Sequence, residues 1–373
     1  MNPLAGGVFS AAADDDLAEL RTLVDEIGRQ SAEARIGQRG LPEEFDHATW
    51  AHLEETGLSR LTSDRDLGAG PAEAAVVLRG LARHAVAAPV AETDLLGAWL
   101  AGVVGLEVHS QGPLTVATGS AELTGAKLTG SARAVPWTRA ATEVLLVLSV
   151  DGRWYVSAAA PGDLDITDGH NLAGEPRDTV GFALPVPAEV DPEVVAELRR
   201  RGAWARCVQM IGALDAAAEL SVAHTRERVQ FGRALSKFQA VQHALAGMAG
   251  EIERARASTT LAVAAAADHG FGSAHTEYAT TLAKVVLGRV VPAVNTVAHQ
   301  LHGALGVTIE HQLWSATNRA YSWVDEFGST GSHARRLGRA ALTGAGDDTS
   351  RDDTLRDGAL WDVLTGADLR TWT

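Results

Sequence analysis

The stretch Arg226–Met248, RERVQFGRALSKFQAVQHALAGM, is the most informative part of the chain for its fold. Its second half opens an apolar series with spacings of 3, 4, 3 and 4 residues, formed by Phe238, Val241, Leu245, Met248 and Ile252. This spacing aligns the side chains along one face of a helix and is typical of a helix packed in a bundle. Because Gly232 ends an earlier helix, the stretch predicts two bundle helices joined by a turn.

The helix before this turn begins at a clear N-terminal signal. Asp191 is a suitable N-cap, and Pro192 stands at the first helical position. The pattern predicts a long helix from there to about Arg226, and further helices at about Ser273–Leu301, at Glu310–Val324 and after Ser332. We therefore expect a C-terminal bundle of four to five helices over residues 189–343.

The N-terminal part of the chain also has helical periodicity. Apolar residues recur at helical spacing in Asp14–Arg29 and Phe45–Thr56, and Pro71 opens an Ala-, Leu- and Val-rich segment that continues to Val86. A fourth helix is predicted at Thr93–Val104. Residues 1–108 are therefore expected to form an N-terminal helical domain.

Between these two helical parts the periodicity shortens and turn residues become frequent. Strands are predicted at Leu114–Thr118, Ala126–Leu128, Val144–Val150 and Trp154–Ala158, with Asp151-Gly152 as the hairpin turn between the last two. Residues 109–188 thus form a small β domain, and residues 344–373 a polar, mobile loop with a short C-terminal segment. The predicted fold class is α+β, mainly α.

Composition excludes several classes of function. The 373 residues include 32 Lys and Arg against 47 Asp and Glu, a net charge of −15. Such an acidic chain lacks the basic surface that nucleic acids or anionic membranes require. Cys207 is the single cysteine, so neither an intrachain disulfide nor a Cys-based metal cluster can form. Without a signal peptide or a long uninterrupted apolar run, we expect a cytoplasmic protein that does not enter a membrane.

Three segments contain side chains suited to chemistry or binding. Arg226–Arg233 places guanidinium groups beside Phe231, a combination that suits a pyrophosphate and a base, although a basic helix C-terminus is the simpler alternative. Gln300–Gly306 offers glycines that allow close backbone approach to a ligand, or else a plain turn between helices. Asp325 and Glu326 supply carboxylates for a general base, or cap a helix end.

Together these segments resemble the acyl-CoA dehydrogenase family. The domain order is the same, RERVQFGRALSKFQAVQHALAGM resembles the family's R-x-x-F-G segment with its later L-A-x-M, and QLHGALGVTIEHQLW (Gln300–Trp314) resembles Q-x-x-G-G-x-G-x-x-x-E. LPEEFDHATWAHLEETGLSRL (Leu41–Leu61) is similar to an N-terminal helix of the family. The resemblance implies FAD bound at a subunit interface, and cofactor-binding roles for Arg228, Phe231, Gln239, Gln300, Leu301, His302 and Gly303.

The departures from the family pattern concern the chemistry. By the family alignment, the usual catalytic Glu falls on Phe327, and its known alternative position falls on Gly202. Neither residue can accept a proton. The family's flavin-contacting W-x-T segment falls near Ala134-Val135-Pro136, with Trp137 displaced, and LTVATGSA (Leu114–Ala121) lacks the T-E-P-x-A-G-S-D pattern. No catalytic residue is therefore expected in this chain. If the chain does carry a base, Glu326 is the candidate.

The resemblance implies one subunit of an α2β2 heteromer. A second acyl-CoA dehydrogenase-like subunit would supply the base for α,β-dehydrogenation of an acyl-CoA, in fatty acid or steroid side-chain β-oxidation. An electron-transfer flavoprotein would take the electrons, and this chain would complete the FAD site. Two alternatives are an active homomeric enzyme that uses Glu326 as a displaced base, and a non-redox scaffold on the same fold. No metal site is expected.

Overall fold

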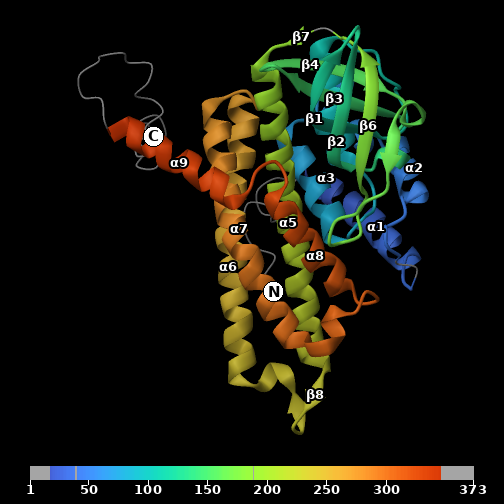
Figure 1. Cartoon of the computed structure of the whole chain (residues 1–373). Coiled ribbons are helices and arrows are strands. Elements are labelled where there is room, and N and C mark those ends of the chain that lie inside the picture. Colours follow the sequence, from blue (N-terminus) through green and yellow to red (C-terminus); the bar gives the residue numbers. More distant parts are fainter. Residues whose placement is uncertain (1–16, 38–39, 188, 346–373) are drawn as a thin grey trace.

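The computed structural model describes residues 17–37, 40–187 and 189–345. It is mainly helical: a bundle of long helices carries a small sheet near one end, and the N-terminal helices lie against the bundle and the sheet (Figure 1). The fold class predicted from the sequence is therefore confirmed. The predicted loop at 344–358 falls almost wholly outside the described residues, as does the start of the predicted helix at Asp14.

Helices form the N-terminal part of the chain, as predicted. Their bounds are α1 Ala18–Ala34, α2 His47–Glu55, α3 Pro71–Arg83 and α4 Trp99–Val104. The fourth differs from the prediction because a π-helical segment, Ala91–Ala98, precedes α4. Within it, the buried Asp94 carboxylate accepts the backbone N–H groups of Thr62 and Ser63, which ties this segment to the chain after α2.

The sheet has seven strands in the order β5-β6-β2-β1-β3-β4-β7. β1 and β3 are parallel, and every other pair in this sheet is antiparallel. The bounds are β1 Leu114–Thr124, β2 Lys127–Pro136, β3 Glu143–Val150, β4 Arg153–Ala159, β5 Asp165–Thr167, β6 Arg177–Pro185 and β7 Glu189–Val190.

The predicted hairpin between β3 and β4 is confirmed. Asp151 and Gly152 have φ values of 49° and 81°, the left-handed pair that a type I′ turn requires. The strand β6, which pairs along most of β2, was not predicted from the sequence. Gly181 and the proline at its end weaken its strand-like sequence pattern, so that the strand is defined by its pairing with β2 and β5.

Five helices follow the sheet. Their bounds are α5 Pro192–Glu227, α6 Gln239–His269, α7 Ala274–His302, α8 Gln312–Asp325 and α9 Thr330–Ala345, with a β8–β9 hairpin (Val229–Gln230 and Arg233–Ala234) between α5 and α6. The Asp191 side chain caps α5 through the Glu193 N–H, as predicted. In the predicted apolar series of α6, Met248 and Ile252 are buried, whereas the earlier members are half-buried because they lie at the bundle end.

The core extends from the bundle into the N-terminal helices. Trp204 on α5 is fully buried and donates its Nε1–H to the Ala262 carbonyl on α6. One helix, α7 with its short extension to Val307, is long and apolar enough to cross a membrane by length and composition alone. Half of its most apolar window is buried inside the molecule, as expected for a core helix of a bundle. The sequence predicted a helix at about Ser273–Leu301 but did not mark it as long and apolar enough to cross a membrane.

Close packing of α3 on α5 makes Gly212 sensitive to substitution. A Cβ at this position would lie 3.0 Å from the Arg83 N atom and closer still to the Arg79 carbonyl oxygen, both backbone atoms of α3. We expect Gly212→Ala to lower the free energy of unfolding by about 2 kcal/mol in urea titrations. Gly250→Ala is the control, because open space surrounds this helical glycine and alanine should stabilise the protein slightly. Equal effects at both positions would contradict the packing argument.

Candidate functional site

A cavity of about 900 Å³ lies between the sheet and the bundle. Its walls come from β1, β2, α5, α7, α9 and the loop after α8. Apolar side chains such as Leu96, Val116 and Phe327 line part of it, and several arginines and carboxylates line the rest. Its size suits a cofactor or a small-molecule substrate.

The two positions expected for a catalytic base lie against each other in this cavity. A Cβ on Gly202 of α5 would lie 2.5 Å from the Cδ1 atom of Phe327, so the phenyl ring occupies the space beside this glycine. Phe327 has a φ of 57°, a left-handed conformation that bulky residues rarely adopt. Neither of the two positions carries a carboxylate. Instead, Gly202 and the ring of Phe327 are in direct contact.

Buried polar contacts hold the loop around Phe327 in this conformation. The Lys284 ammonium on α7 donates to the carbonyls of Trp323, Val324 and Glu326 at 3.1, 2.6 and 2.7 Å. Burial is the main cause that lowers the pKa of Lys284. These contacts satisfy carbonyls at the end of α8, and they offset the backbone strain at Phe327.

Glu326 points into a pair of guanidinium groups. Its carboxylate lies 2.8 Å from Arg177 and 2.6 Å from Arg206. Burial alone would raise the pKa of Glu326, but the two neighbouring arginines outweigh burial and hold that pKa below its usual value. A carboxylate held in this way is a weak proton acceptor, since protonation would break both ion pairs.

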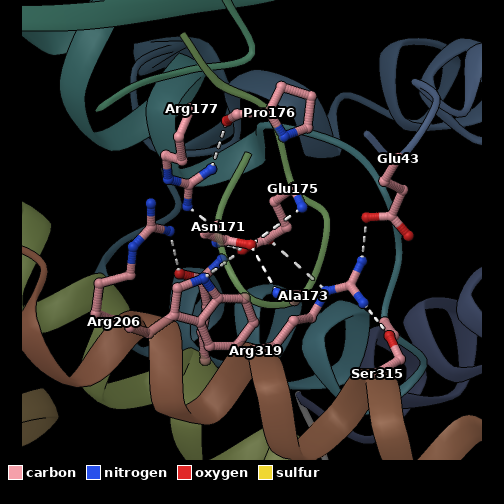
Figure 2. A network of polar contacts seen from close by, with 12 residues as sticks. Glu43, Asn171, Ala173, Glu175, Pro176, Arg177, Arg206, Ser315 and Arg319 are labelled. Atoms are coloured by element: carbon pink, nitrogen blue, oxygen red, sulfur yellow. Dashed lines mark hydrogen bonds and ion pairs between the residues drawn. The ribbon is translucent and has the colours of Figure 1, made fainter. Parts of the chain in front are cut away.

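These contacts belong to a longer chain of alternating charges, which we call the arginine–glutamate chain. Figure 2 shows Glu175 between Arg177 and Arg319. The chain joins the N-terminal helices, the β region and the bundle in the order Arg35, Glu43, Arg319, Glu175, Arg177, Glu326, Arg206 and Glu92. This chain of charges was not predicted from the sequence; its signal was Arg206 within the otherwise apolar stretch Ala203–Val208 of α5.

The segment that matches the family's flavin contact lies at the cavity wall. Ala134, Val135 and Pro136 line the cavity, and the pairing of β2 with β6 shifts between Ala132 and Val135. Trp137 is 3% exposed and packs edge-on against Phe45 at 6.2 Å between ring centroids, outside this cavity lining. The aromatic residue therefore contributes to the core rather than to the cavity.

The first predicted cofactor motif lies at the other end of the bundle, at the β8–β9 hairpin (Figure 1). Arg228 is the C-cap of α5, and Gln239 is the first residue of α6. Phe231 is 89% exposed, with its ring edge-on to Phe238. Arg228 lies 22 residues after Arg206 on the same helix, which is about 33 Å along the helix axis.

The second predicted motif is brought to the same end. Gln300, Leu301 and His302 form the end of α7, and Gly303 follows with a φ of 62°. The ring of His302 stacks on that of His224 in the last turn of α5, at 4.5 Å between centroids. The stack joins the two motifs. His302 itself is 6% exposed, which leaves little of it for a ligand, whereas Gln300 and Gly303 are exposed.

The residues at this end fit the pyrophosphate part of FAD. Arg226, Arg228, Arg233 and Lys237 cluster there with Glu227 as the one acidic neighbour in that stretch. None of the four cations forms an ion pair with a carboxylate of the described residues within 4.0 Å, although Arg233 lies over the Phe238 ring. Free guanidinium groups beside an exposed aromatic ring suit a dinucleotide. Within the described ranges, no group of three or more His, Cys, Asp or Glu side chains could hold a metal ion.

Comparisons with known proteins agree with this geometry. The family model described as acyl-CoA dehydrogenase, C-terminal domain, matches residues 194–342, which include both motifs. The acyl-CoA dehydrogenase IpdE2 of Mycolicibacterium smegmatis is 27% identical over 323 residues, which cover 84% of this chain and 91% of that protein. The chain is therefore similar to acyl-CoA dehydrogenases over most of its length. Acyl-CoA dehydrogenase FadE27 of Mycobacterium tuberculosis is 24% identical over 362 residues, 88% of this chain and 96% of FadE27.

Solved structures share the fold of this chain. The ChsE4-ChsE5 complex from Mycobacterium tuberculosis matches with a TM-score of 0.76 and 22% identity, over 90% of this chain and 99% of that chain. A variant of the Tcur3481-Tcur3483 steroid ACAD matches with a TM-score of 0.77 and 22% identity, over 89% and 99% of the two chains. These likenesses establish the three-part architecture.

Removing the charge of Glu326 should affect stability, because Arg177 and Arg206 would each lose a buried carboxylate partner. We expect Glu326→Gln to lower the free energy of unfolding in urea by about 2 kcal/mol. Glu189→Gln is the matched control, since Glu189 pairs with Arg153 at 3.5 Å on the exposed surface. The control should change stability by less than about 0.5 kcal/mol. A Glu326 variant as stable as this control would contradict the structural role.

Proposed function

We propose that this chain is the non-catalytic subunit of a heteromeric, FAD-dependent acyl-CoA dehydrogenase, in which it completes the FAD site of a partner subunit. A glutamate of the partner would take the α-proton of the acyl-CoA thioester, and FAD, when bound, supplies the acceptor for the β-hydride. An enoyl-CoA results. This chain's part is to bind the pyrophosphate and adenosine end of the cofactor.

The contact between Gly202 and Phe327 is the observation that carries this proposal. The two positions from which family members present a base hold a glycine and a phenyl ring, and the ring fills the space beside the glycine. Glu326 is one residue away, yet its carboxylate is bound to Arg177 and Arg206. Neither of the two usual base positions therefore presents a carboxylate to the cavity. Asp325, the other carboxylate considered from the sequence, is exposed and lines the cavity two residues before Phe327.

The placement of the cofactor motifs supports a site shared between chains. Arg228 and Phe231 are exposed at the end of the bundle, about 33 Å along α5 from the cavity floor at Arg206. Contacts so far apart suit a ligand that lies mainly on another subunit. Because this chain supplies few of the contacts, its own affinity for FAD should be low.

Relatives with known names support the substrate class and the partner. Both the ChsE4-ChsE5 complex and the Tcur3481-Tcur3483 steroid ACAD combine two named proteins, and the second is described as a steroid enzyme. We propose an α2β2 assembly, a bulky acyl-CoA such as a steroid side-chain thioester, an electron-transfer flavoprotein as electron acceptor, and a cytoplasmic location. A homomeric enzyme with Glu326 as base is disfavoured by the two ion pairs of that carboxylate.

The visible absorption spectrum tests the proposal directly. The chain purified alone and incubated with excess FAD should be colourless after gel filtration, because half a site retains little cofactor. Purified together with the acyl-CoA dehydrogenase-like protein encoded beside it, the complex should carry flavin and dehydrogenate acyl-CoA. A stoichiometric flavin spectrum and turnover by the chain alone would refute the proposal.

Arg228 should contribute to flavin retention in that complex. Loss of a charge-assisted hydrogen bond to a pyrophosphate costs about 2 kcal/mol, so we expect Arg228→Ala to weaken FAD binding roughly 30-fold. Arg254→Ala is the control, because Arg254 is an exposed α6 residue paired with Glu251. The readout is the FAD dissociation constant of each complex by equilibrium dialysis. Equal affinities in both variants would exclude Arg228 from the cofactor site.

A further inference from the structure

Four histidines gather where the two cofactor motifs meet. His224 comes from α5, His299 and His302 from α7, and His311 precedes α8. The His302 ring is stacked on His224 at 4.5 Å and meets His311 edge-on at 5.1 Å between centroids. Through these contacts the end of α5, which leads into Arg228, is joined to the Gln300–Gly303 turn.

The hydrogen bonds define the protonation of two of these rings. The Nδ1 of His302 lies 2.8 Å from the Ala298 carbonyl, which can only accept, so Nδ1 carries the proton. Its Nε2 is buried and has no hydrogen-bond partner among the described residues. A second proton would therefore place a buried N–H, and a positive charge, where no acceptor exists.

His299 is held in the same way. Its Nε2 lies 3.0 Å from the Thr317 hydroxyl, whose own hydrogen is donated to the Leu313 carbonyl, so Nε2 is the donor. The remaining Nδ1 is buried and unpartnered within the described part of the chain. Each α7 histidine thus has one ring nitrogen in a hydrogen bond and one that is buried without a partner among the described residues.

Charged neighbours act in the same direction. Burial first, then His302 and Arg228, lower the pKa of His224, and only Glu227 opposes them. Burial and then His302 lower the pKa of His299. The helix C-termini at which His224 and His302 lie would favour a cation, but for His224 the net direction is downward, so burial and the neighbouring cations prevail.

We propose that the His224–His302 stack is a positioning element that holds the Arg228 hairpin and the Gln300–Gly303 turn together, and that protonation of the His224 ring loosens it. A histidine that is harder to protonate in the folded state contributes stability that is complete above its unfolded pKa, near 6.5, and is lost as the pH falls below it. The half-site should therefore weaken in mildly acidic solution. The effect on the ligand rests on the proposed FAD half-site.

Binding of ADP-ribose tests the effect on the ligand. This molecule carries the adenosine and pyrophosphate of FAD, and its phosphates keep their charge between pH 8 and pH 5.5. Calorimetry on the full chain should show affinity about tenfold weaker at pH 5.5 than at pH 8. His224→Phe keeps a stacked ring that cannot titrate, so its affinity should change far less. The control is His275→Phe, in the exposed His269–His275 stack at the other end of the bundle, which should behave like the wild type.

Hydrogen exchange tests the stack without any ligand. After correction for the intrinsic pH dependence, the amides of residues 224–238 should lose protection at pH 5.5 in the wild type and in His275→Phe, but not in His224→Phe. Equal loss in all three proteins would overturn the positioning role. Absence of ADP-ribose binding at both pH values, with the exchange pattern intact, would instead refute the half-site and leave the stack supported.

Discussion

The arginine–glutamate chain is the constraint on which the arrangement of the three parts depends. Six of its eight members are at most 8% exposed: Glu43, Glu92, Glu175, Arg177, Arg206 and Arg319. Buried charges are costly unless each has a partner, and here each arginine lies between carboxylates or beside one. A shift of the sheet relative to the bundle would separate Arg177 on β6 from Glu326 after α8. The charges thus specify one relative placement of the N-terminal helices, the sheet and α5.

The same constraint explains the state of the cavity. Glu326 contributes its carboxylate to the chain, Lys284 binds the backbone carbonyls around it, and Phe327 is left with its ring on Gly202. These contacts stabilise one conformation of the loop after α8, in which its side chains bind other parts of the chain. At the opposite end of the bundle, Arg228 and Phe231 have no such commitments and are exposed. Near the cavity, the charged side chains are therefore paired within the chain. At the β8–β9 end, exposed side chains are available to a ligand.

Much of the fold followed from local patterns, because helical periodicity and turn chemistry depend on neighbours in sequence. The cap at Asp191 and the turn at Asp151-Gly152 are of this kind. The two family motifs, around Arg228 and Gln300, lie at one end of the bundle in the structure. The strand β6 and the partners of Glu326 were not predictable, since they depend on pairing across the chain. Arg177 precedes Glu326 by 149 positions and Arg206 by 120, and no local pattern relates such residues.

The packing of Phe327 on Gly202 also restricts how this protein can change during evolution. A glutamate at position 202 would meet the phenyl ring at its first side-chain carbon, so that substitution is harmful until position 327 has changed. A smaller residue at 327 alone would leave a hole against α5 and no gain in activity. A carboxylate at position 202 therefore needs two substitutions, with position 327 changed first. Each of the two residues thus restricts which substitutions the other can accept.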